Sequence, residues 1–267
     1  MGLESIPNLD DPRIAHYRDL KDRELAVMSD DLFMVESEQL VRRLLASAFA
    51  VHSILVTEKR AAAIAPLVPA AVPVYVAASD VLNQIIGFKF HSGTLAIARR
   101  PTSPAIADVI ADNSRVLIVV CPEIANTENL GSMIRIAAAF GADAMLIGER
   151  SCDPFFRQSV RVSMGAVFTL PIVRSRDIVG DLKSLRSRGV ELFATVLDES
   201  AEVLSDVAPP ARMAILFGNE AQGLSQEHVA MCDRHVTIPM KLGTDSLNVA
   251  VAAGVFLYHF TREHVTR

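Results

Sequence analysis

The second half of the chain alternates between short apolar runs and segments with helical spacing. Residues 116–120 read VLIVV, a β-branched run that is typical of a buried parallel strand. Similar runs predict strands at 143–148, 190–197, 213–220 and 235–240. Helical patterns lie between them, over 129–141, 177–189, 225–232 and 246–260. This alternation predicts an α/β fold whose mostly parallel sheet is covered by helices on both faces.

The first half shows a smaller α/β pattern. Ser37 is placed to cap a helix, because Leu40, Val41, Leu44 and Leu45 then share one face. Strands are predicted at 52–58, 73–79 and 94–100, with a helix over 79–86 that Ser79 or Asp80 would cap. Pro101 and Pro104 then open a linker that carries a short helix. We therefore divide the chain into an N-terminal extension (1–30), a small α/β domain (31–104), a linker (105–113) and a parallel-sheet domain (114–267).

Composition fits a folded protein of one large or two ordinary domains. The 267 residues are 51% hydrophobic and 21% charged. No apolar run reaches the length of about 18 residues that a transmembrane helix needs. The first residues, MGLESIPNLDDPR, lack the apolar segment of a secretory signal. We expect a cytoplasmic protein that does not enter a membrane.

Cysteine spacing bears on a metal site, and the distribution of charge bears on phosphate binding. Cys121, Cys152 and Cys232 form no CxxC pair and have no histidine at ligand spacing, so we expect buried thiols and no metal site. The net charge is −5, yet residues 150–188 carry eight basic side chains against three acidic ones. This local excess fits either a phosphate-binding field or an ordinary solvated face.

The segment NTENLGSMIR, residues 126–135, follows the first strand of the parallel-sheet domain. A helix that begins near Asn129 would bring Asn129 and Arg135 toward one edge, nearly two turns apart. Arg135 is the only charged residue between Glu128 and Asp143. An arginine in such an apolar helix requires an anionic partner, which is either a ligand or an internal carboxylate.

Two more polar segments follow later strands. In ILFGNEAQGLS, residues 215–225, Gly218 and Gly223 bracket Glu220 and permit tight turns. In IPMKLGTDSLN, residues 238–248, Ser246 and Asn248 stand at the start of the last helix, where unpaired N–H groups can bind a ligand or need a cap. In open α/β sheets, ligands bind at the carboxyl ends of the strands. The sequence has no GxGxxG, P-loop or GxSxG motif, so it does not favour a dinucleotide site, a P-loop nucleotide site or a serine hydrolase.

In order and spacing, these three segments resemble the three motifs of the SpoU (TrmH-type) RNA 2′-O-ribose methyltransferases of the SPOUT superfamily. RVSMGAVFTLPIV, residues 161–173, is similar to the segment between the first two motifs. FMVESEQLVRRLLAS, ILVTEKR and HSGTLAIA resemble the ribosomal-protein-like (L30e-like) substrate-binding domain that often precedes them. One departure is that the family often has Asp-Pro where this chain has Asn126-Thr127.

The resemblance implies an S-adenosyl-methionine-dependent enzyme with a deep trefoil knot in the parallel-sheet domain and a homodimer formed by that domain. The implied cofactor-binding residues are Thr195, Gly218, Ile238, Met240 and Leu247. The implied catalytic residues are Asn129, Arg135, Glu220, Ser246 and Asn248. We assign Arg135 to phosphate binding and alkoxide stabilisation, because its high pKa argues against a general base.

The expected partner is RNA, ribosomal RNA in preference to transfer RNA. Candidate RNA contacts are Arg42, Arg43, Lys89, Arg99, Arg100, Arg157 and Arg161. Two alternatives stay open: a non-catalytic RNA-binding or ribosome-assembly protein with the same fold, and a small-molecule methyltransferase or nucleotide-binding enzyme. Uptake of S-adenosyl-methionine and the nature of the methyl acceptor separate the three hypotheses.

Overall fold

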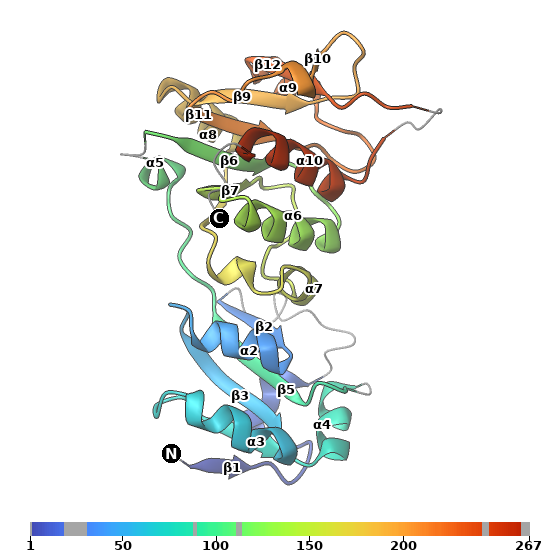
Figure 1. Ribbon diagram of the computed structural model, residues 1–267. Coiled ribbons are helices and arrows are strands. Elements are labelled where there is room, and N and C mark those ends of the chain that lie inside the picture. Colours follow the sequence, from blue (N-terminus) through green and yellow to red (C-terminus); the bar gives the residue numbers. More distant parts are fainter. Residues whose placement is uncertain (1, 19–30, 88–89, 111–113, 242–245, 263–267) are drawn as a thin grey trace. The chain divides into compact units, whose positions relative to one another are not determined.

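A computed structural model of the chain describes residues 2–18, 31–87, 90–110, 114–241 and 246–262 (Figure 1). The chain divides into two compact units. Unit 1 contains Met1–Thr102 and Phe155–Phe168, and unit 2 contains Ser103–Pro154 and Thr169–Arg267. The segment between the first and second motifs thus contributes Phe155–Phe168 to unit 1, although it lies far along the chain from the rest of that unit.

Unit 2 is built on a seven-stranded sheet in the order β10-β12-β9-β11-β6-β7-β8, and all its neighbouring strands are parallel. The strands are β6 (Val116–Cys121), β7 (Ala144–Ile147), β8 (Ile172–Arg174), β9 (Glu191–Thr195), β10 (Glu202–Val203), β11 (Arg212–Leu216) and β12 (Arg234–Thr237). The helices are α5 (Ile106–Val109), α6 (Thr127–Ala139), α8 (Ile178–Ser187), α9 (Gln226–Met231) and α10 (Val249–Thr261), with a 3₁₀ turn η4 (Leu204–Asp206). The predicted parallel sheet is confirmed.

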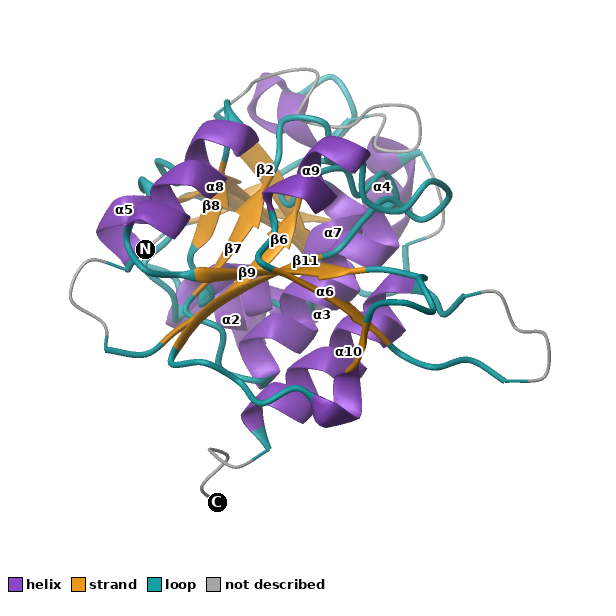
Figure 2. Ribbon diagram, turned by 90° about the horizontal axis from the view of Figure 1, so that it is seen from above, coloured by secondary structure: helices purple, strands orange, loops and turns teal. Residues whose placement is uncertain are grey.

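The helices of unit 2 cover both faces of its sheet. Figure 2 shows α5, α8 and α9 on one side and α6 and α10 on the other. Between them the central strands β6 and β11 are almost wholly buried, which explains why their sequences read as continuous apolar runs. Helix α6 ends just before Gly141, whose φ of 72° gives the left-handed turn that glycine favours.

The last helix begins later than the sequence pattern predicts. Asn248, not Ser246, is the N-cap of α10, because its Oδ1 accepts hydrogen bonds from the backbone N–H groups of Ala250 and Val251. Ser246 therefore stands outside the helix. The Ser246 side chain is therefore not used as the helix cap.

Unit 1 holds a five-stranded mixed sheet in the order β1-β4-β3-β5-β2, in which β5 runs antiparallel to β3 and β2. The strands are β1 (Leu3–Ser5), β2 (Leu32–Glu36), β3 (Val51–Thr57), β4 (Val74–Ala77) and β5 (Thr94–Arg99). The helices are α2 (Glu38–Leu45), α3 (Glu58–Ile64), α4 (Ser79–Ile86) and α7 (Arg157–Val162), with 3₁₀ turns η1 (Pro12–Tyr17), η2 (Ala65–Leu67) and η3 (Ala166–Phe168).

Two helix starts in unit 1 test the predicted caps. Ser37 caps α2 through its side chain, and Leu40, Val41 and Leu44 are buried as predicted. The prediction for α4 was wrong by one residue, because Ala78 is the N-cap. Ser79 and Asp80 lie instead in the first turn, where the Asp80 carboxylate favours the positive end of the helix dipole.

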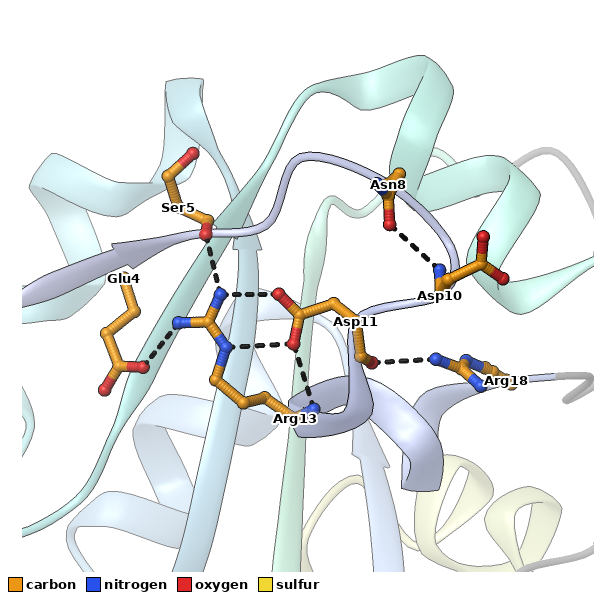
Figure 3. A network of polar contacts seen from close by, with 7 residues as sticks. All are labelled: Glu4, Ser5, Asn8, Asp10, Asp11, Arg13 and Arg18. Atoms are coloured by element: carbon orange, nitrogen blue, oxygen red, sulfur yellow. Dashed lines mark hydrogen bonds and ion pairs between the residues drawn. The ribbon is translucent and has the colours of Figure 1, made fainter.

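The residues expected to form an N-terminal extension contribute to the sheet of unit 1. Strand β1 pairs in parallel with β4, from Leu3 opposite Val74 to Ser5 opposite Val76. Arg13 connects β1 to η1, because its guanidinium donates to the Glu4 carboxylate at 2.8 Å and to the Ser5 carbonyl at 3.1 Å, and it also binds Asp11 (Figure 3). This network fixes the first strand at the sheet edge.

Candidate functional site

Four adjacent strands of unit 2 end beside one another at the carboxyl edge of the sheet. In the order β12-β9-β11-β6, three of them lead into the segments that carry the three motifs, and β9 ends at Thr195. Strand β6 leads to α6, β11 leads to the glycine-flanked loop around Glu220, and β12 leads toward α10. Because parallel strands place their carboxyl ends at one edge, residues more than a hundred positions apart meet there.

A cavity of about 600 Å³ opens at this edge, within the range of small-molecule sites. Its apolar wall includes Phe217, Ala252 and Phe256, and its rim carries polar side chains and strand-end backbone. All five predicted cofactor residues line it: Thr195, Gly218, Ile238, Met240 and Leu247. Four of the five predicted catalytic residues line it as well: Asn129, Glu220, Ser246 and Asn248. The three motifs therefore converge on one cavity.

A directed chain of hydrogen bonds joins the three motifs. Asn129 Nδ2 donates to Glu220 Oε1 at 2.9 Å, and Asn129 Oδ1 accepts from Asn248 Nδ2 at 2.9 Å. Asn248 Oδ1 then caps α10. The carboxylate accepts only, so it sets the orientation of the Asn129 amide, which in turn sets that of Asn248. We call Glu220, Asn129 and Asn248 the amide relay.

Glu220 anchors this relay as a carboxylate. Its oxygens also accept from the backbone N–H groups of Asn126 at 3.0 Å and Ala125 at 3.2 Å. Partial burial alone would raise the pKa of the Glu220 carboxyl, but the hydrogen bonds from Asn129 and from the backbone outweigh it and lower the pKa. The carboxylate is therefore ionised at neutral pH and holds the loop before α6 in place.

Gly218 is required by close backbone packing at the cavity wall. A Cβ atom there would lie 2.2 Å from the carbonyl carbon of Gly223 and from the backbone nitrogen of Leu224. The loop between these residues is closed by paired backbone hydrogen bonds between Asn219 and Gly223, each 2.9 Å long. Even the smallest side chain at residue 218 would push this loop away from the strand end.

The departure from the family pattern at Asn126-Thr127 preserves the local geometry. Asn126 is the N-cap of α6, with its Oδ1 accepting from Glu128 N–H at 2.8 Å and Asn129 N–H at 3.1 Å. Asparagine and aspartate are about equally good N-caps. Thr127 takes the first helical position, the one where proline is common because its missing N–H costs nothing.

Arg135 lies apart from the cavity. It is on α6, about 9 Å along the helix axis from Asn129, and its side chain is exposed. No ion pair or hydrogen bond to its guanidinium is found among the described residues. The alternative of an internal salt bridge, left open by the sequence, has no support in the part of the chain that the structure describes.

The predicted RNA contacts fall into two groups, and all those described lie in unit 1. Arg42 binds the Glu38 carboxylate and the Ala63 carbonyl, Arg43 binds the Met164 carbonyl, and Arg157 pairs with Glu36 at 3.1 Å. Arg100 donates to the Leu32 carbonyl and lies over the Phe155 ring. Arg99 and Arg161 are exposed and have no side-chain partner among the described residues. Lys89 lies outside the described residues.

The basic stretch 150–188 is partly neutralised by ion pairs within each unit. Arg150 pairs with Glu123, Arg174 with Asp153 at 2.7 Å, and Arg186 with Asp233 at 2.6 Å, in addition to the Arg157–Glu36 pair. Half of its eight basic side chains thus already have a carboxylate partner. Internal pairing thus removes half of these charges from any phosphate-binding field.

The three cysteines form no disulfide among the described residues, and burial raises the pKa of the Cys121 thiol and raises that of Cys232 to about 12. Within the described ranges, no group of acidic, histidine or cysteine side chains is arranged to hold a metal ion. In the same ranges, every helix is too short or too polar to cross a bilayer.

Asp198 and Asn219 are two of the polar cavity residues that the sequence patterns missed. Asp198 follows β9 and lines the cavity, and hydrogen bonds from the Ser200 backbone and hydroxyl lower the pKa of its carboxyl. Asn219 fixes the glycine-flanked loop by donating to the Glu123 carbonyl at 3.0 Å and accepting from Ala221 N–H at 2.9 Å. Both stand just after a strand, so the strand-end rule alone would have flagged them.

Comparison with known proteins agrees with this geometry. The family model described as "SpoU rRNA Methylase family" matches residues 116–258. An uncharacterized tRNA/rRNA methyltransferase of Mycobacterium bovis is 35% identical over 98% of this chain and 93% of its own length. The 23S rRNA (guanosine(2553)-2′-O)-methyltransferase of Bacillus subtilis is 28% identical over 85% of this chain and 87% of its own.

Solved structures extend the likeness over nearly the whole chain. An AdoMet-bound rRNA methyltransferase from Sinorhizobium meliloti superposes with a TM-score of 0.84 at 25% identity, covering 99% of both chains. The SpoU methyltransferase AviRb from Streptomyces viridochromogenes, in complex with AdoMet, gives a TM-score of 0.81 at 25% identity over 96% of this chain and 99% of its own.

Proposed function

The chain belongs to the SpoU rRNA methylase family, and from that premise we propose that it transfers a methyl group from S-adenosyl-methionine to a ribose 2′-hydroxyl of RNA. One observation carries the proposal: three distant motifs meet at a single cavity and are joined there by the amide relay. A protein that had kept only the fold would not need a carboxylate, two amides and a glycine held in this register.

The residues of the cavity fit the proposed cofactor. S-adenosyl-methionine supplies an electrophilic methyl group on a sulfonium, next to an aromatic base and a zwitterionic chain. The apolar wall at Phe217 and Phe256 suits the base, and the strand-end backbone near Gly218 and Leu247 offers hydrogen bonds. Thr195, Ile238 and Met240 complete the set that would hold it. Gly218 lets the loop around Glu220 pack directly on the strand end and so shapes this wall of the cavity.

The amide relay would position the reactants and would not itself exchange protons. Glu220 is ionised and saturated by donors, so it is a poor proton acceptor for a hydroxyl. Its role is to fix Asn129 and, through it, the start of α10. Ser246 lies at the cavity and outside the helix, where it is free to hydrogen-bond the ribose. Alignment of the reactants can supply roughly 7 to 11 kcal/mol of the rate acceleration.

Arg135 would provide the positive charge for the RNA. A guanidinium stays protonated at any working pH, so it binds phosphate and stabilises the oxyanion that forms as the 2′-proton leaves. Arg135 does not line the cavity of its own chain, and we therefore assign it to the active site of a second copy.

A homodimer through unit 2 is supported by an apolar stripe on α10. Val251, Val255 and Tyr258 recur at helical spacing and are 54%, 40% and 62% exposed. Helix α10 packs against α6, the helix of Arg135, closely enough that a Cβ added at Gly254 would lie 4.0 Å from the Ile136 side chain. A partner that covers the stripe would thus lie close to Arg135.

The same proposal extends to the rest of the molecule. Unit 2 carries the family's trefoil knot, and unit 1 selects the RNA as an L30e-like domain. The enzyme modifies ribosomal RNA in the cytoplasm.

The test combines cofactor binding with methyl transfer. Calorimetry should show uptake of S-adenosyl-methionine, and labelled methyl should enter ribosomal RNA at a ribose 2′-oxygen. The phosphodiester bond next to the methylated ribose should then resist alkaline cleavage. Arg135→Ala should abolish transfer and leave cofactor affinity nearly unchanged. Cofactor uptake without transfer to any RNA would favour a binding protein or a metabolite methyltransferase, and full activity of Arg135→Ala would remove Arg135 from the mechanism.

Sedimentation tests the homodimer separately. Val255→Asp places a charge in the α10 stripe and should convert a dimer into a monomer that still binds cofactor. Wild-type protein that sediments as a monomer at the enzyme's working concentration would contradict both the dimer and the assignment of Arg135 to a second copy.

A further inference from the structure

Three side chains that can carry positive charge gather at one place in unit 1. His16 comes from η1, His52 from β3, and Arg99 from the end of β5. The His16 and His52 rings meet edge to face, with centroids 5.6 Å apart, and Arg99 is close enough to act electrostatically on His52. We refer to these three residues as the His-Arg cluster.

A backbone irregularity places His52 in this cluster. Strands β3 and β5 pair from Val56 back to Ser53, and then the register shifts between Ser53 and Val51. His52 is the extra residue at this bulge, and bulges redirect side chains and recur near functional sites. Arg99 lies at the same end of the ladder, where its N–H donates to the Ala50 carbonyl at 2.8 Å.

Buried hydroxyl groups engage one nitrogen of the His52 ring. Burial raises the pKa of Tyr17, so its hydroxyl keeps its proton, and it lies 2.8 Å from Ser53 Oγ. The Ser53 hydroxyl also lies 3.2 Å from His52 Nδ1, so this ring nitrogen is already engaged within the unit. The other ring nitrogen, Nε2, has no hydrogen-bond partner among the described residues and is left to meet a ligand.

Among the described residues of unit 1, no carboxylate pairs with the charges of the cluster. No ion pair to His16, His52 or Arg99 is found within the described ranges. Burial lowers the pKa of His52, and the positive charges of His16 and Arg99 lower it further, with no carboxylate acting against them. The Nδ1 atom of His16 is buried without a hydrogen-bond partner among these residues. Like charges and unmet donors cost stability unless a ligand supplies negative charge.

We propose that the His-Arg cluster is a phosphate-binding subsite that holds the RNA backbone on unit 1. The inference rests on the proposed function, which makes RNA the substrate. Phosphate oxygens accept from guanidinium and imidazole N–H groups alike, and such contacts position RNA without reading its sequence. Arg42, Arg43 and Arg157 are engaged internally, whereas Arg99 presents an exposed guanidinium with no internal partner among the described residues.

The test measures how the cluster contributes to RNA affinity and to its salt dependence. A short fluorescein-labelled RNA hairpin is titrated with full-length protein at several salt concentrations. Arg99→Gln should weaken binding about 3- to 10-fold at low salt and reduce the slope of log K against log salt by about 0.7 to 0.9, one phosphate contact. His52→Gln should add a further loss. The Hε1 resonances of His16 and His52 should shift when RNA is added to the wild-type protein.

Lys59→Gln is the matched control, since it removes one positive charge from an exposed position on α3 of the same unit. Equal RNA affinities and salt slopes for Arg99→Gln and Lys59→Gln would overturn the subsite, as would histidine resonances that stay fixed on RNA addition or a wild-type protein that does not bind the hairpin. Calorimetry with S-adenosyl-methionine on the same preparations separates the two claims, because loss of the subsite leaves cofactor uptake intact, whereas absence of uptake refutes the proposed function itself.

Discussion

The polar side chains of the unit 2 cavity and those of the unit 1 His-Arg cluster are held in opposite ways. In the cavity, Glu220, Asn129 and Asn248 use their hydrogen-bonding groups on one another and on backbone. In the cluster, the outward groups of His16, His52 and Arg99 have no internal acceptor within the described residues. A site that aligns two reactants needs rigidity, whereas a surface that grips a polyanion needs charge left free.

Gly218→Ala should break the cavity most severely. The new Cβ would lie 2.2 Å from backbone atoms of Gly223 and Leu224, so the loop around Glu220 must shift. We expect a loss of about 1–3 kcal/mol in the free energy of unfolding and S-adenosyl-methionine binding at least about 100-fold weaker. Thermal unfolding and calorimetry measure the two effects.

Gly254→Ala, inside helix α10, is the control for this change. Among the described residues, a Cβ atom at residue 254 would meet only Ile136 of α6, at 4.0 Å. This variant should bind cofactor like the wild type and gain up to about 1 kcal/mol of stability from helix propensity. Equal cofactor affinity in the two variants would show that the wall at Gly218 does not shape the site.

Asn129→Asp should break the amide relay with almost no change in shape. The Nδ2 donor to Glu220 becomes an oxygen, which brings two carboxylates to hydrogen-bond distance. We expect a cost of about 1–3 kcal/mol in unfolding free energy and a fall of roughly 100-fold in kcat/KM for methyl transfer, as alignment is lost.

Asn83→Asp on α4 is the matched control. Among the described residues, the Asn83 side chain uses only its oxygen, which accepts from Phe90 N–H at 2.7 Å. That variant should keep both stability and activity. Unchanged transfer by Asn129→Asp would mean that the relay is a structural detail outside the reaction.

Acid titration compares the relay with the rest of the fold. The pKa of Glu220 is lowered in the folded protein, so its stabilising effect is complete above the unfolded value of about 4.3 and is lost as pH falls through the folded pKa. Wild-type stability should therefore decline more steeply below about pH 4.3 than that of Glu220→Gln, which lacks this titration. Chemical denaturation across this range measures the difference, and parallel curves would contradict it.

Sequence patterns located the unit 2 site far better than the unit 1 surface. The strand-end rule and the motif resemblance brought Asn129, Glu220 and Asn248 to one edge, because each motif is local and each follows a parallel strand. They could not show that Arg42 is tied to Glu38 or that His52 sits on a bulge, since both depend on side chains and registers set by the whole sheet. The sequence left the role of Ser246 open between a helix cap and a ligand contact, and the structure gives the cap to Asn248.

Arg42→Gln sharpens the contrast within unit 1. Its guanidinium is held by Glu38 and by the Ala63 carbonyl, so little of it is left for a phosphate. We expect RNA affinity to change less than about twofold, against the larger loss for Arg99→Gln, and stability to fall by less than about 1 kcal/mol. Hairpin titration of the two variants side by side decides whether internal pairing predicts which arginines contact RNA, and an equal loss would refute that rule.

The smallest effect is expected where this chain departs from its family. Asn126→Asp keeps the acceptor that caps α6, and the helix dipole favours the added negative charge. The Glu220 carboxylate opposes it, because Glu220 Oε1 lies 3.0 Å from the backbone nitrogen of Asn126. Since the favourable helix-dipole effect and the unfavourable repulsion from Glu220 are similar in size, the unfolding free energy should change by less than about 0.5 kcal/mol at neutral pH. In the background of Glu220→Gln the repulsion is gone, so the same substitution should become stabilising. A double-mutant cycle measures this coupling, and a substitution effect that is the same with and without the Glu220 charge would show that the cap and the relay are independent.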